Sequence, residues 1–154
     1  MTTSPRERPA RMMRNGRDED QQFDENELMY RRYIEDDFDG GYFRPVRFRF
    51  PPSLNRQRYS EPEDVIFSET GAFDEHGVLE CSVAQLSLDL VDDREFRYSF
   101  IPVHRPEDNS YSHSEIWADC EQTGTRDAEP SQVAKKKFRT KASELFQIRI
   151  KSQK

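Results

Sequence analysis

The sequence predicts a single compact α+β domain, in which a mixed or antiparallel sheet carries a C-terminal helix packed on it. The chain has 154 residues, enough for one domain with a modest core. Aromatic residues make up 12% of it, which favours a folded core although 35% of the residues are charged. Segments of alternating apolar and polar residues fill the middle of the chain, and a segment with helical periodicity lies near its end. The order of these segments is not a regular alternation of strand and helix, which favours α+β over α/β.

The first 22 residues combine Arg, Pro, Gly, Asp and Gln with almost no apolar side chains. Such a segment cannot bury enough surface to offset the entropy lost on ordering. We therefore predict a disordered N-terminal arm over residues 1–22 and a folded domain over residues 23–154. The alternative is an arm that folds on a partner. A short helix is expected over Glu25–Arg32, where Asp24 or Asn26 can act as the N-cap.

An arginine-rich segment, Tyr42–Phe50, comes next. Its apolar residues alternate with Arg47 and Arg49, and this period of two predicts a half-buried strand whose outer face carries the two arginines. Basic residues interleaved with aromatic rings also occur on nucleic-acid-binding surfaces, and Arg56 would add a further phosphate contact. Because the rings alternate toward the interior, we favour the core interpretation of this segment.

The middle of the chain is predicted to form strands. One covers Val78–Val83 and is followed by a short helix, and another covers Glu95–Val103. The stretch Phe100–Cys120 is typical of a strand, a tight polar loop and a second strand. Cys120 lies an odd number of residues after His113, so the two side chains are expected on opposite faces, with Cys120 in the core.

The end of the chain is predicted to be a helix over Gln132–Leu145, capped by Ser131, and a closing strand over Phe146–Lys151. Residues 131–154 carry a net charge of +7 and all six lysines, which leaves −13 for residues 1–130. This asymmetry indicates either a docking surface for an anion or acidic partner, or a basic helix packed on the acidic body. The candidate binding residues on this helix are Lys135, Lys136 and Lys137.

The polar loop between the two central strands is the main candidate site. His104 and His113 flank it, and Asn109 lies at its turn. A bend between paired strands would bring the histidines together, where they could act as acid and base, bind phosphate or ligate a metal. Alternatively, Asn109 shapes the turn and the histidines bond to loop carbonyls. The spacing of histidine and cysteine matches no zinc pattern, so we predict no metal and no cofactor.

Several classes of function find no support in the sequence. It contains no P-loop, no G-x-S-x-G and no H-E-x-x-H motif. It has no run of about 18 apolar residues and no secretory signal, so we expect no membrane association. Its two cysteines are too few for a disulfide framework, and we therefore expect a cytoplasmic protein.

Three short motifs occur in the chain, each at one place. They are ELMYRR at Glu27–Arg32, a Phe-Arg segment at Arg47–Phe50, and a loop with His104, Pro106, Asn109 and His113. In these motifs the chain resembles a group of small, uncharacterised bacterial proteins, over roughly Glu27 to Leu145. It departs from the group at Tyr111-Ser112, where a small residue is usual. The resemblance implies no activity, but it implies a setting in bacterial conflict or defence systems.

The sequence as a whole favours a non-catalytic binding or accessory module that acts with a protein partner. Two alternatives remain. One is a small hydrolase or nuclease that uses His104 and His113. The other is nucleic-acid binding through the arginine-rich strand and the lysine-rich helix.

Overall fold

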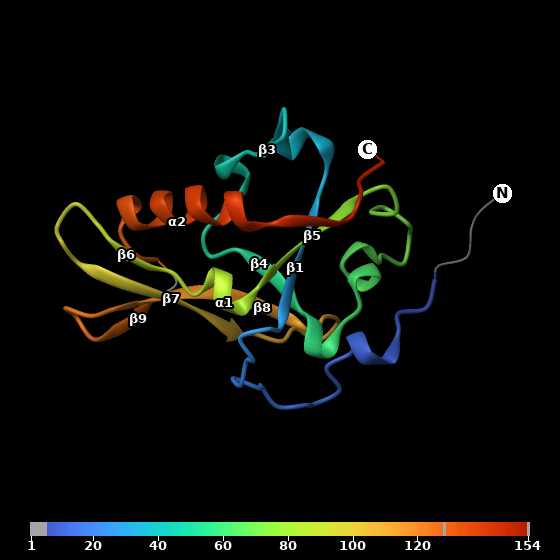
Figure 1. Cartoon of the computed structure of the whole chain (residues 1–154). Coiled ribbons are helices and arrows are strands. Elements are labelled where there is room, and N and C mark those ends of the chain that lie inside the picture. The colour runs from blue at the N-terminus through green and yellow to red at the C-terminus, as the bar shows by residue number, and fades with distance from the viewer. Residues whose placement is uncertain (1–5, 128, 154) are drawn as a thin grey trace.

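The computed structural model describes residues 6–127 and 129–153. Its main element is an eight-stranded sheet with the order β10-β5-β1-β4-β8-β7-β6, and β9 pairs with β8 outside this path. Neighbouring strands are antiparallel throughout the described residues. The C-terminal helix α2 lies across the sheet (Figure 1). The predicted α+β class is therefore confirmed, with the antiparallel form of the sheet.

The strands have the following bounds: β1 Leu28–Tyr33, β2 Phe38–Asp39, β3 Tyr42–Phe43, β4 Ser53–Arg56, β5 Gly77–Ser82, β6 Asp89–Val91, β7 Arg97–His104, β8 His113–Cys120, β9 Thr125–Asp127 and β10 Gln147–Ile150. The α-helices are α1 Val83–Leu86 and α2 Gln132–Leu145. Short 3₁₀ helices are η1 Ala10–Met12, η2 Glu35–Asp37, η3 Pro45–Arg47, η4 Gln57–Tyr59 and η5 Pro62–Ile66.

The core lies between α2 and the sheet. Phe138 of α2 is fully buried, stacks on Phe100 of β7 with the ring centroids 4.7 Å apart, and meets Phe48 and Phe50 at 6.2 and 5.3 Å. The Ser131 hydroxyl caps the helix by accepting a hydrogen bond from the Ala134 amide at 3.2 Å. The predicted helix over Gln132–Leu145 is confirmed with both of its bounds. Both bounds could be predicted because the N-cap serine and the apolar stripe are signals within the segment itself.

The central strand–loop–strand unit is also confirmed. Strands β7 and β8 pair from Tyr98–Cys120 to His104–Ser114. Alternate residues of β8 are buried, and Cys120 is among them, as its predicted face requires. The predicted strand before α1 and the short helix α1 are present as β5 and α1.

Two predicted elements are wrong. The expected helix over Glu25–Arg32 is instead strand β1, which pairs with both β5 and β4. The expected arginine-rich strand over Tyr42–Phe50 is divided into the two-residue β3 and the 3₁₀ helix η3, which begins at a proline. Arg47 and Arg49 are exposed while Phe48 and Phe50 are buried, so the alternation of burial holds without a strand. The side chain of Val46, assigned to the same buried face, lies outside the described residues.

Residues 6–22, here called the strap, run along the body of the protein in the structure. Met12 is buried, and its carbonyl accepts a hydrogen bond from the Tyr111 amide at 2.8 Å. Arg11 contacts both carboxylate oxygens of Asp64, at 2.7 and 2.6 Å. These contacts give part of the predicted disordered arm a defined course over the loop that joins β7 and β8. Residues 1–5 of that arm lie outside the described residues.

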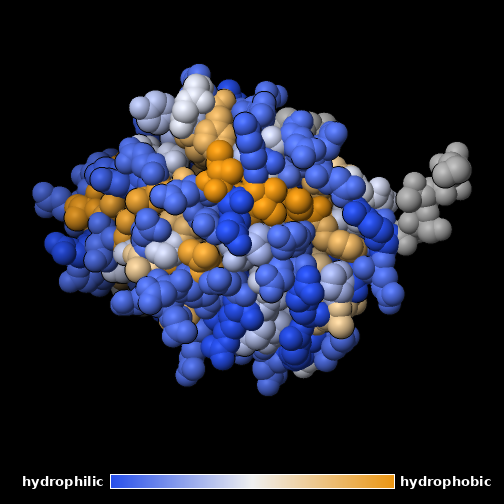
Figure 2. All heavy atoms as spheres, turned by 45° about the vertical axis from the view of Figure 1, so that its right-hand side comes forward, coloured by the Kyte–Doolittle hydropathy of each residue, from blue (hydrophilic) through white to orange (hydrophobic). Residues whose placement is uncertain are grey.

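The surface is mainly hydrophilic (Figure 2), as expected for a chain in which 35% of the residues are charged. Figure 2 shows a mainly hydrophilic face, on which apolar residues form a broken band. None of the helices in the described part of the chain has the length and hydrophobicity that a membrane span needs.

Candidate arginine-lined site

The structure does not bring His104 and His113 together on one face. His104 lies opposite Ser114 in the β7–β8 register, and His113 is the residue before Ser114. Because neighbouring residues of a strand point to opposite faces, the two imidazoles lie on opposite sides of the sheet. The predicted histidine pair is therefore not assembled, and each histidine has its own surroundings.

His104 is fully buried and holds the strap against the sheet. Its Nδ1 accepts a hydrogen bond from the Asp20 amide at 2.8 Å, and its Nε2 donates to the Tyr111 carbonyl at 2.5 Å. Burial lowers the pKa of His104, the charge of Arg56 lowers it further, and the bond to the Tyr111 carbonyl opposes both effects. With both ring nitrogens occupied inside the protein, His104 has a structural role.

Acid is therefore expected to destabilise the protein through His104. A lowered pKa means that folding favours the neutral ring, so this contribution is complete above the ordinary value of about 6.5 and is lost as the pH falls through the folded-state pKa. Protonation also removes the acceptor for the Asp20 amide. Urea unfolding at about pH 8 and about pH 5 should show a larger loss of stability in the wild type than in the His104→Gln variant. Equal losses would show that His104 does not couple pH to folding.

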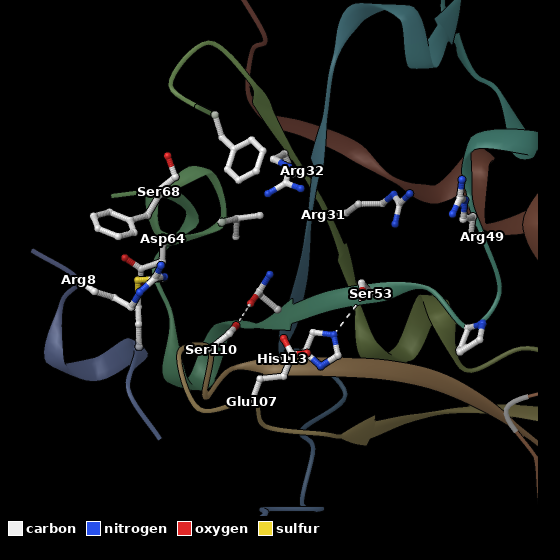
Figure 3. Close-up of a pocket in the computed structure, with 16 residues that line it drawn as sticks. Arg8, Arg31, Arg32, Arg49, Ser53, Asp64, Ser68, Glu107, Ser110 and His113 are labelled. Carbon is white, nitrogen blue, oxygen red and sulfur yellow. Dashed lines mark hydrogen bonds between the residues drawn. The ribbon is translucent and has the colours of Figure 1, made fainter. Parts of the chain in front are cut away.

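His113 lies on the opposite face, in the wall of a cavity of about 610 Å³ (Figure 3). Four arginines contribute to the lining, Arg31 and Arg32 from β1, Arg49 from the segment before β4, and Arg8 from the strap. The described pairing of β1 with β4 covers only Met29 and Tyr30, so the cavity lies where the two strands part. The remaining polar lining residues are Ser53, Asn55, Asp64, Ser68, Glu107 and Ser110.

Arg31, Arg32 and Arg49 form the charged centre of this cavity, here called the arginine cluster. Burial lowers the pKa of Arg31, and the charges of Arg32 and Arg49 lower it further, against the opposing effect of Asp37. Burial also lowers the pKa of Arg32. Guanidinium groups remain charged in proteins despite such shifts. Three like charges are therefore held close together, and an anion placed among them would relieve their repulsion.

The arginine cluster has few partners inside the protein. Among the described residues, Arg31 donates one hydrogen bond, from Nη2 to the Arg47 carbonyl at 2.8 Å, and its buried Nε has no acceptor. The Arg32 guanidinium lies 3.6 Å from the centre of the Phe73 ring. No carboxylate of the described residues approaches any of the three within 4.0 Å. A buried donor without an acceptor is costly, so the cluster is suited to an external anion.

Two acidic residues of the described part of the chain line the cavity, Asp64 and Glu107, and Asp64 is engaged by other groups. Asp64 receives both hydrogen bonds from Arg11 and also caps η5 by accepting from the Glu61 amide at 2.9 Å. Arg8 lies 3.5 Å from Glu69 and stacks on Phe67. Asp64 is thus balanced by Arg11, and the charges of Arg31, Arg32 and Arg49 outnumber that of Glu107, so the cavity lining is positive on balance.

The other predicted site residues are distributed over the surface. Arg47 pairs with Asp37 at 3.8 Å and is not among the residues that line the cavity. Asn109 is exposed, and its backbone carbonyl accepts a weak bond of 3.4 Å from Arg8. Arg56, expected as a phosphate contact, is instead fully buried against Glu27. It is therefore removed from any nucleic-acid surface.

The lysines of α2 lie apart from this cavity lining. Lys135 contacts Glu129, Lys137 donates to the Val91 carbonyl at 2.6 Å, and Lys136 is exposed. Among the described residues, the contact with Glu129 is the one ion pair made by a basic residue of α2. Ion pairs with the acidic body therefore do not explain why α2 is so basic. That the helix is a docking surface for an anion or acidic partner stays a prediction.

Sequence reasoning missed Arg8, Arg31, Arg32 and Ser53 as site residues. Arg31 and Arg32 are adjacent in the sequence, but the predicted helix over Glu25–Arg32 gave no reason to expect them in a strand. Only strand β1 places them in the same cavity lining as Arg49. Arg8 was assigned to the disordered arm. Ser53 carries no recognisable motif, and only the pairing of β4 with β8 places it beside His113.

No group of three or more His, Cys, Asp or Glu side chains in the described ranges is arranged to hold a metal ion. A scan against protein-family models, a search of curated proteins and a search of solved structures each return no match. The argument for function therefore rests on the geometry of the arginine-lined cavity.

Proposed function

We propose that the protein is a binding module that holds an anionic group of its ligand in the arginine-lined cavity. The observation that carries this proposal is the arginine cluster, in which three guanidinium groups line one cavity and no carboxylate of the described residues lies within 4.0 Å of them. Arginine binds phosphate and carboxylate groups through paired hydrogen bonds, so clusters of this kind favour such anions. Several positive charges in one cavity favour a ligand with more than one negative charge.

The expected carrier of this anionic group is a protein partner that presents a phosphorylated or acidic side chain. Ser53, Arg49 and Glu107 line the cavity and are exposed, so a group attached to a larger molecule can reach it. The Arg8 contribution from the strap would make the N-terminal segment part of the binding site. A setting in bacterial conflict or defence systems and a cytoplasmic location are proposed from the sequence alone.

Pyrophosphate is a suitable probe because it carries several charges on two phosphate groups. Calorimetric titration should detect binding to the wild-type protein. The Arg31→Gln and Arg49→Gln variants should each bind about 10-fold to 100-fold more weakly, since a hydrogen bond to a charged group contributes about 1.5–3 kcal/mol. Arg139→Gln on α2 removes the same charge away from the cavity lining and should leave the affinity unchanged.

Two results would contradict the proposal. One is no binding to the wild type at millimolar pyrophosphate. The other is an equal loss of affinity in the Arg139→Gln control, which would indicate a nonspecific charge effect. Tight binding of a single-stranded oligonucleotide that depends on Lys135, Lys136 and Lys137, and not on Arg31, would favour the nucleic-acid alternative instead.

A further inference from the structure

We infer that Ser53 and His113 form a nucleophile–base pair in the wall of the arginine-lined cavity and cleave carboxylic esters of anionic compounds. The nature of this substrate rests on the proposed function, because the arginine cluster would bind its anionic part. The pair itself rests on a separate observation, the hydrogen bonds of His113. It would give the protein an activity that the expected non-catalytic module lacks.

The hydrogen bonds of His113 determine which ring nitrogen carries the proton. Its Nδ1 lies 2.9 Å from the Arg105 carbonyl oxygen, which can only accept a hydrogen bond. In the neutral ring, Nδ1 therefore carries the hydrogen, and Nε2 has a free electron pair. The Ser53 hydroxyl lies 3.0 Å from this Nε2 (Figure 3). This is the orientation in which a histidine can take a proton from a serine hydroxyl.

Two paired strands hold the residues in this position. In the register of β4 with β8, Asn55 lies opposite His113 and Ser53 lies opposite Glu115. Ser53 and His113 are thus diagonal neighbours on one face of the sheet, which is within reach for side chains of this length. The Arg105 amide donates a backbone hydrogen bond of 3.0 Å to the His113 carbonyl, which holds the Arg105 carbonyl near the His113 ring that it contacts.

The surroundings suit attack on an ester. Ser53 is exposed, so a substrate can reach its hydroxyl, and it lines the same cavity as the arginine cluster. Positive charge near the reacting group stabilises the negative charge that develops on the carbonyl oxygen. The buried and fully engaged His104 takes no part, which distinguishes this pair from the histidine pair expected from the sequence.

The proposed step is acyl transfer followed by hydrolysis. The Ser53 oxygen attacks the ester carbonyl carbon while His113 Nε2 takes the hydroxyl proton. The bond from the carbonyl carbon to the alcohol oxygen then breaks, and His113 returns the proton to the leaving alcohol. Water, deprotonated by His113, attacks the acyl-serine, and Ser53 recovers its proton as the acid is released. No oxidant, reductant or metal is needed.

A fluorophosphonate probe tests this pair directly. An activated serine displaces fluoride from the phosphorus atom of the probe and forms a stable adduct. Intact-mass measurement of the full chain should show one adduct, and peptide mapping should place it on Ser53. Ser53→Ala should abolish the adduct. His113→Gln should slow its formation by about 100-fold, the scale of a general base. Ser143→Ala removes a serine from α2, away from the cavity lining, and should label at the wild-type rate.

Absence of an adduct on wild-type Ser53 would overturn the inference, as would an unchanged labelling rate in a folded His113→Gln variant. Circular dichroism shows whether each variant is folded. The pyrophosphate titration separates this result from the proposed function. If pyrophosphate binds but Ser53 is not labelled, the proposed binding function stands and the catalytic pair is refuted. If Ser53 is labelled but pyrophosphate does not bind, the catalytic pair stands and the anionic substrate is refuted.

Discussion

Replacing Glu27 by alanine is expected to lower the free energy of unfolding by about 3–5 kcal/mol, the scale for removing one partner of a buried ion pair. Glu27 is 8% exposed, and its carboxylate accepts two hydrogen bonds from Arg56, at 2.9 and 2.8 Å. Arg56 is 0% exposed. Its guanidinium cannot reach water, so the substitution leaves a buried charge without its main counterion.

The same ion pair anchors the strap and its continuation. Arg56 also donates to the carbonyls of Asp20 and Gln22, at 2.5 and 2.7 Å, and lies 3.8 Å from the centre of the Phe23 ring. Loss of Glu27 should therefore loosen these contacts before the sheet unfolds. Amide hydrogen exchange should show faster exchange at Asp20, whose amide is bonded to His104.

Urea denaturation provides the measurement for Glu27→Ala. Asp119→Ala removes one partner of the exposed Arg126–Asp119 pair and should cost less than about 1 kcal/mol. Adding Arg56→Met to Glu27→Ala should recover part of the loss, because the unpaired charge is removed as well. A loss below about 1 kcal/mol for Glu27→Ala would show that Arg56 is not a buried charge in solution.

Replacing Phe138 by alanine is expected to cost about 3–5 kcal/mol of folding free energy. The Phe138 ring is fully buried and is surrounded by the rings of Phe48, Phe50 and Phe100. Alanine would leave a cavity among three aromatic rings that the rigid sheet cannot close. Because this ring fastens α2 to the sheet, the loss should appear as one cooperative shift of the unfolding midpoint.

Phe138→Leu serves as the matched control, since it keeps an apolar side chain of intermediate volume. Its cost should be clearly smaller than that of Phe138→Ala. Lys136→Ala on the exposed side of the same helix should change the stability by no more than about 0.5 kcal/mol. Similar losses for Phe138→Ala and Lys136→Ala in urea denaturation would contradict the packing of α2 on the sheet.

The elements that the sequence predicted correctly have local signals. Helix α2 combines a serine cap with apolar residues at helical spacing, so its bounds follow from the segment itself. The alternation in β7 and β8 likewise shows which side chains face the core. In contrast, Leu28–Tyr33 fits a short helix or a strand equally well. Only its pairing with β5 and β4 decides for a strand, and those partners lie far away in the chain.

The candidate site was harder to predict because separate segments build it. Arg8, Arg31 and Arg49 come from the strap, β1 and the segment before β4, and no sequence motif links them. The strap itself has the composition of a disordered segment. Its contacts are long-range bonds, such as Arg11 with Asp64 and the Asp20 amide with His104, that composition does not reveal. The residue type of His113 makes it a candidate in the sequence, whereas its hydrogen-bond partner Ser53 carries no such signal.

The most direct test of the proposed function follows the side chain of Arg31 by NMR during the pyrophosphate titration. Its Nε has no acceptor in the part of the chain that the structure describes, whereas the Nε of Arg126 already donates to Asp119 at 2.8 Å. We predict that the Arg31 Nε–H resonance shifts in a saturable manner and that the Arg126 resonance does not move. An unchanged Arg31 resonance, or equal shifts at both arginines, would contradict anion binding in the arginine-lined cavity.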